Sequence, residues 1–157
     1  MKPNIGLTPA NLKKVTDILS AVLADAMMIS IKTHKFHWNV SGESFMEYHK
    51  LFDEHYEKLG EAIDEIAERI SKLGSMAIGT TKEFAEMSQI KEAPGKNPSS
   101  IEMVKELLKD HETIIQTLRK NIDECAEKIK DAGTADFLTN MMEAHETLAW
   151  TLRRYLN

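Results

Sequence analysis

Cysteine is nearly absent from this sequence, since Cys125 is the single one among 157 residues. One cysteine cannot form a disulfide within the chain, which excludes the small secreted domains that disulfides hold together. Glycine and proline are also scarce, with 7 and 4 residues. Because these two residues interrupt helices, while Ala, Leu, Glu, Lys and Met favour them, the composition predicts an all-α protein.

Long apolar runs and an excess of positive charge are missing too. No run approaches the roughly 18 apolar residues of a membrane span, and the N-terminal residues hold no apolar signal core. We therefore expect a cytoplasmic protein without membrane contact. The net charge of −5 argues against nucleic-acid binding through bulk electrostatics. The length favours a single domain over residues 1–157.

Apolar residues recur every three or four positions in four long segments, which predicts four helices. A long connection separates the second from the third, and TTKEFAEMS within it predicts a short extra helix. Such a connection is needed if the second and third helices run parallel in a four-helix bundle. The expected helices run from Thr8-Pro9 to about Trp38, from about Ser44 to Leu73-Gly74, from Ser99 or Ser100 to about Asp131, and from a Thr134 cap to Tyr155 or Leu156.

Residue types that bind metals gather at the end of the first helix and along the second. Five of them are candidate ligands: His37, His49, Asp53, Asp64 and Glu68. The last four lie on one side of the second helix, within roughly 100° of His49. Eleven residues separate Asp53 from Asp64, however, which corresponds to about 16 Å along a helix. One chain therefore cannot build a single site from both groups.

Two copies of the second helix, paired antiparallel across a two-fold axis, remove this obstacle. One register sets His49 opposite Glu68 and Asp53 opposite Asp64, because both pairs are centred between residues 58 and 59. Gly60 lies beside that crossing, where a missing side chain permits close approach. We therefore predict two equivalent sites per dimer, each with His37, His49 and Asp53 from one chain and Asp64 and Glu68 from its mate.

A simpler interpretation is that these polar residues only solvate the boundary of the apolar stripe on the second helix. That stripe is formed by Phe45, Tyr48, Phe52, Tyr56, Leu59, Ile63, Ile66, Ile70 and Leu73. An ordinary ferritin builds its metal site inside one bundle from Glu-x-x-His pairs, and this chain contains no such pair. The absence of that pair favours the arrangement between subunits.

The run HWNVSG at residues 37–42, followed by Phe45, His49, Phe52, Tyr56, Asp64 and Ala67-Glu68-Arg69, resembles the Dps family of mini-ferritins. The resemblance extends over essentially the whole chain. It implies a ferritin-like four-helix bundle that assembles into a dodecameric shell. It further implies a two-iron ferroxidase centre between subunits, at His37, His49, Asp53, Asp64 and Glu68. Mixed imidazole and carboxylate ligands suit Fe(II).

The function that this resemblance implies is oxidation of Fe(II), typically by hydrogen peroxide, with storage of ferric mineral and protection against oxidative stress. One alternative is a non-enzymatic, nucleoid-compacting or structural helical assembly, and another is a helical interaction module without metal. DNA binding in this family usually needs a basic tail. Here only Lys2 precedes the first helix cap and the chain ends at Asn157, so we expect weak or no DNA binding.

Overall fold

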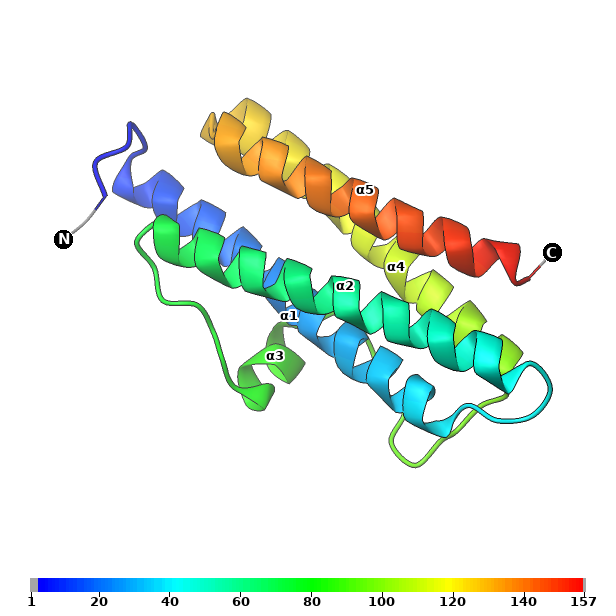
Figure 1. Ribbon diagram of the computed structural model, residues 1–157. Helices are drawn as coiled ribbons and strands as arrows, with labels where there is room; N and C mark the ends of the chain where they lie inside the picture. Colours follow the sequence, from blue (N-terminus) through cyan, green and yellow to red (C-terminus); the bar gives the residue numbers. More distant parts are fainter. Residues whose placement is uncertain (1–2, 157) are drawn as a thin grey trace.

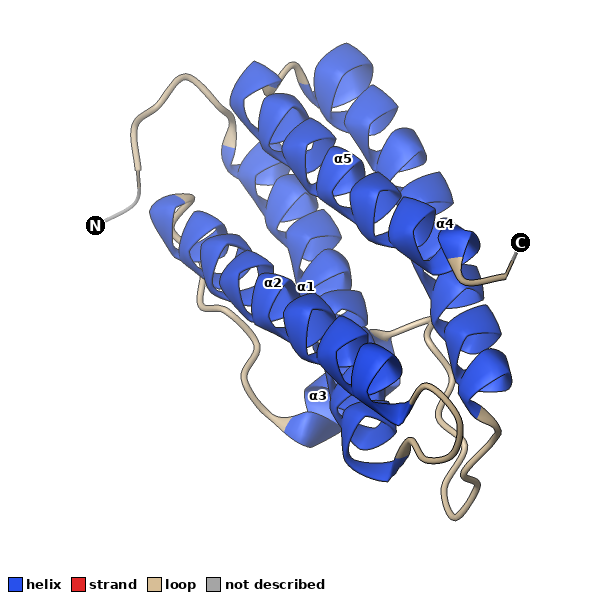
Figure 2. Cartoon of the chain, turned by 45° about the vertical axis from the view of Figure 1, so that its right-hand side comes forward, coloured by secondary structure: helices blue, strands red, loops and turns tan. Residues whose placement is uncertain are grey.

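The computed structural model describes residues 3–156, and these residues form helices and loops without a strand (Figure 2). Lys2 and Asn157, on which the DNA-binding expectation draws, lie outside them. Four long helices form a bundle of two antiparallel hairpins, α1 with α2 and α4 with α5 (Figure 1). No described helix is long and apolar enough to cross a membrane. The helices are α1 (Pro9–Asn39), α2 (Phe45–Lys72), α3 (Thr81–Met87), α4 (Ser100–Asp123), the π-helical turn η1 (Glu124–Ile129) and α5 (Ala132–Arg154).

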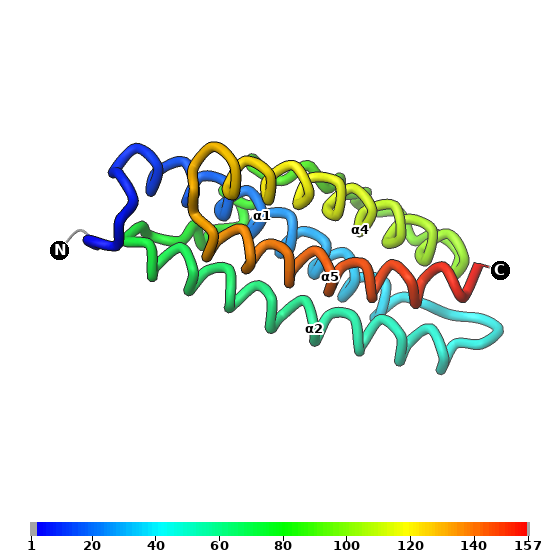
Figure 3. Tube along the Cα trace, turned by 90° about the horizontal axis from the view of Figure 1, so that it is seen from above, coloured from blue at the N-terminus to red at the C-terminus, as the bar shows by residue number. Residues whose placement is uncertain are grey.

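The predicted all-α, ferritin-like arrangement is confirmed, including the short helix in the long connection. The helices α2 and α4 run in the same direction, so the chain between them must return along the bundle, and α3 lies on this path against α1 (Figures 1 and 3). Both helix-start signals of the sequence hold. Thr8 caps α1 by accepting a hydrogen bond from Asn11 N, and Ser99 caps α4 by accepting one from Glu102 N.

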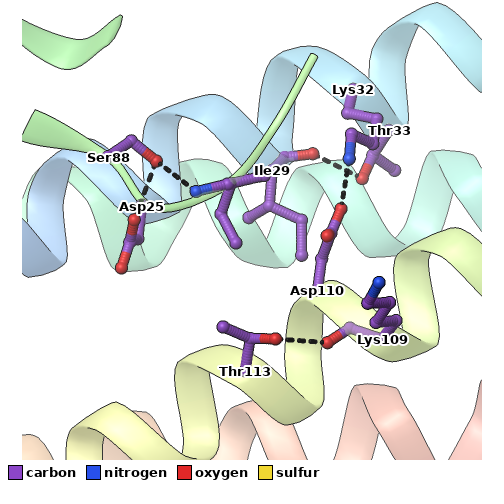
Figure 4. A network of polar contacts seen from close by, with 9 residues as sticks. Asp25, Ile29, Lys32, Thr33, Ser88, Lys109, Asp110 and Thr113 are labelled. Carbon is purple, nitrogen blue, oxygen red and sulfur yellow. Dashed lines mark hydrogen bonds and ion pairs between the residues drawn. The ribbon is translucent and has the colours of Figure 1, made fainter. Parts of the chain in front are cut away.

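Buried polar contacts fix the long connection to the bundle. The Ser88 hydroxyl and the backbone N–H of Gln89 both donate to Oδ1 of Asp25, a carboxylate of α1 that is 5% exposed. Lys32 of α1 forms an ion pair of 2.5 Å with Asp110 of α4. Figure 4 shows the Ser88–Asp25 and Lys32–Asp110 contacts, which lie about two turns apart along α1. Because these groups are largely buried, breaking either contact would leave a charge without its partner.

Two details of the last hairpin differ from the prediction. The third long helix ends at Asp123 and continues as η1, after which Lys130 takes a left-handed conformation with φ of 64°. The cap of α5 is Asp131 rather than Thr134. The Asp131 carboxylate accepts from both the backbone N–H and the hydroxyl of Thr134, so Thr134 is the donor that the cap satisfies. Sequence favoured threonine there, yet an aspartate three residues earlier caps equally well.

The apolar face of α2 is also rotated slightly from the predicted stripe. His55 is buried at 2% exposure, whereas the neighbouring Tyr56, which the stripe included, is half-buried. Phe45, at the start of the helix, is 39% exposed. Tyr56 therefore lies on the partly exposed side of the helix, which also carries Asp53.

Replacing Asp131 by alanine should lower the free energy of unfolding by about 2 kcal/mol, because Thr134 then loses the acceptor for two buried donors. Urea denaturation at fixed protein concentration measures the change. Thr8→Ala, at the exposed cap of α1, is the matched control and should cost about 1 kcal/mol or less. Equal losses in the two variants would contradict the role assigned to Asp131.

Candidate metal centre

Where α1 meets α2, the side chain of His37 forms a hydrogen bond with the backbone of His49, and the side chain of His49 forms one with the backbone of His37. The ring Nδ1 of His37 is 2.8 Å from the carbonyl oxygen of His49, and Nδ1 of His49 is 2.9 Å from the carbonyl oxygen of His37. The two rings stack with centroids 3.8 Å apart. These reciprocal bonds are possible because the loop between the helices is short, with Gly42 at φ of 95° and Ser44 at 58°.

The hydrogen bonds fix the tautomer of both rings. A carbonyl oxygen only accepts, so each Nδ1 must carry the proton. An imidazole that carries its single proton on Nδ1 has its lone pair on Nε2. Histidines that bind metals in proteins nearly always have this arrangement, with the second ring N–H held by a carbonyl or carboxylate. Both imidazoles are thus oriented as ligands before any metal arrives.

Asp53 lies one turn after His49 and faces the same place. Its Oδ1 is 4.0 Å from Nε2 of His37, where the side chains are 42% and 12% exposed. Bonds of histidine nitrogen and carboxylate oxygen to a transition metal are each about 2 Å long. The gap therefore matches the sum of two such bonds, and an ion between these atoms would contact both.

Tyr56 is a participant that the sequence analysis missed. Its hydroxyl donates a short hydrogen bond to Oδ1 of Asp53, and this bond is the main cause that raises the pKa of Tyr56 above its ordinary value. Its ring stacks on His34 at 3.9 Å and meets His37 edge-on at 5.2 Å. The signal was the spacing of three residues from Asp53, which places both side chains on one face of a helix.

Asp64 and Glu68 lie near the other end of α2, and both are exposed. Glu68 accepts a hydrogen bond of 2.8 Å from Lys72, which lowers the pKa of Glu68. An exposed pair of this kind contributes little stability, so a metal ion can displace the lysine. A side chain at Gly60, between the two groups, would meet no atom within 4 Å in the single chain.

The single chain brings together His37, His49 and Asp53 but leaves Asp64 and Glu68 apart from them. Within residues 3–156, no three His, Cys, Asp or Glu side chains converge on one metal ion. The pairing of the two groups across a dimer stays a prediction.

Comparison with known proteins gives the family. The pattern described as Ferritin, a ferritin-like domain, matches residues 16–157. A curated relative, the DNA protection during starvation protein 2 of Bacillus anthracis, is 37% identical over 145 residues, which cover 92% of this chain and 98% of that protein. This chain belongs to the Dps family.

Two further relatives extend the match. An uncharacterized low temperature-induced protein of Nostoc is 45% identical over 153 residues, covering 98% of this chain and 86% of that protein. The Dps crystal structure from Vibrio cholerae O1 superposes with a TM-score of 0.92 at 27% identity, covering 100% of this chain and 98% of the other. That protein is described as a member of a broad superfamily of ferritin-like diiron-carboxylate proteins.

The bond between Tyr56 and Asp53 predicts that Asp53→Asn lowers the pKa of Tyr56 toward 10, since the negative charge opposing ionisation is lost. Ultraviolet absorbance of tyrosinate during alkaline titration measures this. Subtracting the curve of Tyr56→Phe isolates Tyr56 from Tyr48 and Tyr155. An unchanged titration in Asp53→Asn would show that the two side chains do not interact in solution.

Proposed function

We propose that this Dps-family protein oxidises Fe(II) and stores the ferric product, and thereby protects against oxidative stress. The observation that carries the proposal is the pair His37 and His49, whose Nδ1 atoms donate to backbone carbonyls, so that Nε2 of each ring is the nitrogen left to bind a metal. Iron is the substrate, in keeping with the diiron-carboxylate superfamily named for the Vibrio relative. Iron storage and protection against oxidative stress are what the family supports in general terms.

The complete site, in this proposal, forms between two chains. His37, His49 and Asp53 of one chain bind iron together with Asp64 and Glu68 of its two-fold mate. Large apolar side chains are exposed around the first group, with Trp38 at 71%, Phe45 at 39% and Met46 at 66%. Exposed apolar surface beside a half-built site is what a subunit interface covers. We further propose the dodecameric shell of the family, located in the cytoplasm.

Two irons held together match the chemistry of hydrogen peroxide, our proposed oxidant. Each Fe(II) loses one electron, the O–O bond accepts the two electrons, and two hydroxide ions form. Delivering both electrons at one site avoids the hydroxyl radical that a one-electron step would release. The Tyr56 hydroxyl, bonded to Asp53, holds that carboxylate toward His37.

Pairs of variants test both the activity and the site between chains. Anaerobic apoprotein loaded with Fe(II) and then given hydrogen peroxide should show rapid ferric absorbance. His49→Ala and Asp64→Ala should each slow it at least about 100-fold, as loss of a metal ligand does. When both variants are co-expressed, a mixed dimer holds one site with all five ligands. Random mixing therefore restores about a quarter of the wild-type rate.

The matched control mixes His49→Ala with Asp53→Ala, which belong to the same half of the site. No mixed dimer then holds an intact site, so activity should stay lost. Failure of the first mixture to recover would disprove the pairing between chains. Absence of iron oxidation by the wild-type protein would disprove the enzymatic function, and would leave the structural or nucleoid-compacting assembly as the alternative.

DNA binding is proposed to be weak or absent. The net charge is −5, and many basic side chains on the surface are already paired with acids. Such pairs include Lys13–Asp17, Lys50–Glu54, Lys82–Glu86, Lys105–Glu102, Arg119–Glu146 and Lys128–Glu124. Strong binding to phosphates requires several cations presented together.

In a gel shift at about 0.15 M salt we therefore expect no retarded duplex DNA. The double variant E124K/E127K is the positive control. It replaces the acids that pair with Lys128 and Lys130 by two lysines, so that four cations lie close together. That variant should bind more tightly than the wild type, with an affinity that falls as salt rises. Tight, stoichiometric binding by the wild type would contradict the proposal.

A further inference from the structure

Three histidines meet in the interior of the bundle, away from the proposed iron site. His55 of α2, His111 of α4 and His145 of α5 are 2%, 0% and 4% exposed. The ring centroids of His55 and His111 are 5.9 Å apart, and those of His111 and His145 are 5.0 Å apart. Histidine is polar, so a buried cluster of three requires an explanation beyond packing.

The tautomer of His55 follows from its neighbour Thr151. Nε2 of His55 is 2.9 Å from the Thr151 hydroxyl oxygen, and that hydroxyl donates its only proton to the carbonyl of Leu148. The hydroxyl oxygen must therefore accept, and His55 Nε2 carries the ring proton. The other nitrogen, Nδ1, is left with a bare lone pair. It is buried and has no hydrogen-bond partner among the described residues.

The same reasoning applies to His111. Its Nδ1 is 2.8 Å from Nδ1 of His145, so one of the two donates. Nε2 of His111 is buried without a partner in the described chain. If His145 donated, this Nε2 would carry an unsatisfied N–H in the core, which costs more than an unused lone pair. His111 therefore donates, and its Nε2 lone pair is bare.

Each of these two histidines thus has its ring N–H bound and its second nitrogen free, as metal-binding histidines do. Burial lowers the pKa of His55 to about 4 and that of His111 well below its ordinary value. Both rings are therefore neutral at pH 7. Two imidazoles bound to one ion, with bonds of about 2 Å, have centroids roughly 5 to 6 Å apart. The separation of 5.9 Å between His55 and His111 lies in this range.

The surroundings select the kind of cation. Among residues 3–156, the neighbours that lower the pKa values of His55 and His111 are Lys58 and the other histidines, and none of these is a carboxylate that would compensate a buried positive charge. The cost of burying an ion rises steeply with its charge, which favours a monovalent cation over a divalent one. Since no three such side chains converge in residues 3–156, the ion must also accept two ligands. Cu(I) meets both conditions and binds imidazole.

We propose that His55 Nδ1 and His111 Nε2 bind one Cu(I) ion in the bundle core. Thr151 and His145 act as positioning residues, because they hold the two ligand rings in the required tautomer. A cavity of about 390 Å³ between α2 and α5 reaches His145, the hydrogen-bond partner of His111. His145 lines it, together with the thioether residue Met141, two acids and one lysine: Glu61, Glu65 and Lys58.

The test is a titration of the assembled, anaerobic protein with Cu(I), in competition with the chelator bicinchoninate. One ion per chain should bind with unchanged affinity in His37→Ala, which alters the proposed iron site. His55→Leu and His111→Leu should each lose it. X-ray absorption should show two nitrogen ligands at about 2 Å. Copper binding that is absent from the wild type, or retained in both leucine variants, would overturn the proposal, as would a water molecule bonded to both nitrogens in copper-treated crystals.

A variant that keeps both ligands tests the tautomer argument. Thr151→Val removes the acceptor of His55 Nε2 and should weaken Cu(I) binding about 10-fold to 100-fold. Thr147→Val, one turn earlier on α5, is the matched control, because its hydroxyl bonds only the carbonyl of Glu143. It should bind Cu(I) as the wild type does. Equal affinities in Thr151→Val and wild type would show that Thr151 does not position His55. Because the readout is copper affinity, the result is independent of iron oxidation.

Discussion

A neutral imidazole has one N–H donor and one nitrogen with a free lone pair. The group that accepts the N–H hydrogen bond therefore decides which nitrogen keeps the lone pair. In this protein that rule operates twice, at opposite depths of the molecule. Near the surface, backbone carbonyl oxygens accept hydrogen bonds from Nδ1 of His37 and Nδ1 of His49. In the core, the Thr151 hydroxyl oxygen accepts a hydrogen bond from His55 Nε2, and Nδ1 of His145 accepts one from Nδ1 of His111. The arrangement of the helices matters to function mainly because it brings each ring to such an acceptor.

The short connection between α1 and α2 is what makes the outer pair possible. His37 lies in the last turn of α1 and His49 near the start of α2, and each ring bonds the backbone of the other helix. The same helix α2 also carries Asp64 and Glu68 at its far end. A rigid helix of 28 residues keeps these two groups apart in one chain, whereas a symmetric partner would bring them together.

Much of this could be predicted from the sequence. Helix periodicity, the caps Thr8 and Ser99, and the short helix at residues 81–87 all follow from local rules and are confirmed. The cap of α5 could not be decided, because Asp131 and Thr134 are both good capping residues and only the position of Lys130 in a left-handed turn separates them. A difference of one residue on α2 decided whether His55 or Tyr56 faces the core, and periodicity does not resolve such a rotation.

The metal-binding face was predicted by residue type and spacing, but its hydrogen bonds were not. Tyr56 was assigned to the apolar stripe, although its spacing of three residues from Asp53 places the two side chains on one face of α2, where they bond. The core histidines could not be grouped from sequence, since 56 residues separate His55 from His111 and only the tertiary fold makes them neighbours. Local patterns therefore predicted the candidate surface site, whereas the interior cluster required the assembled bundle.

The placement of both ligand groups on α2 has a consequence for how activity depends on abundance. If each complete site draws ligands from two chains, the number of sites at low expression rises with the square of the chain concentration rather than in proportion to it. A newly made chain would then be inert toward iron while it is dilute. Redox chemistry would begin only once chains have paired.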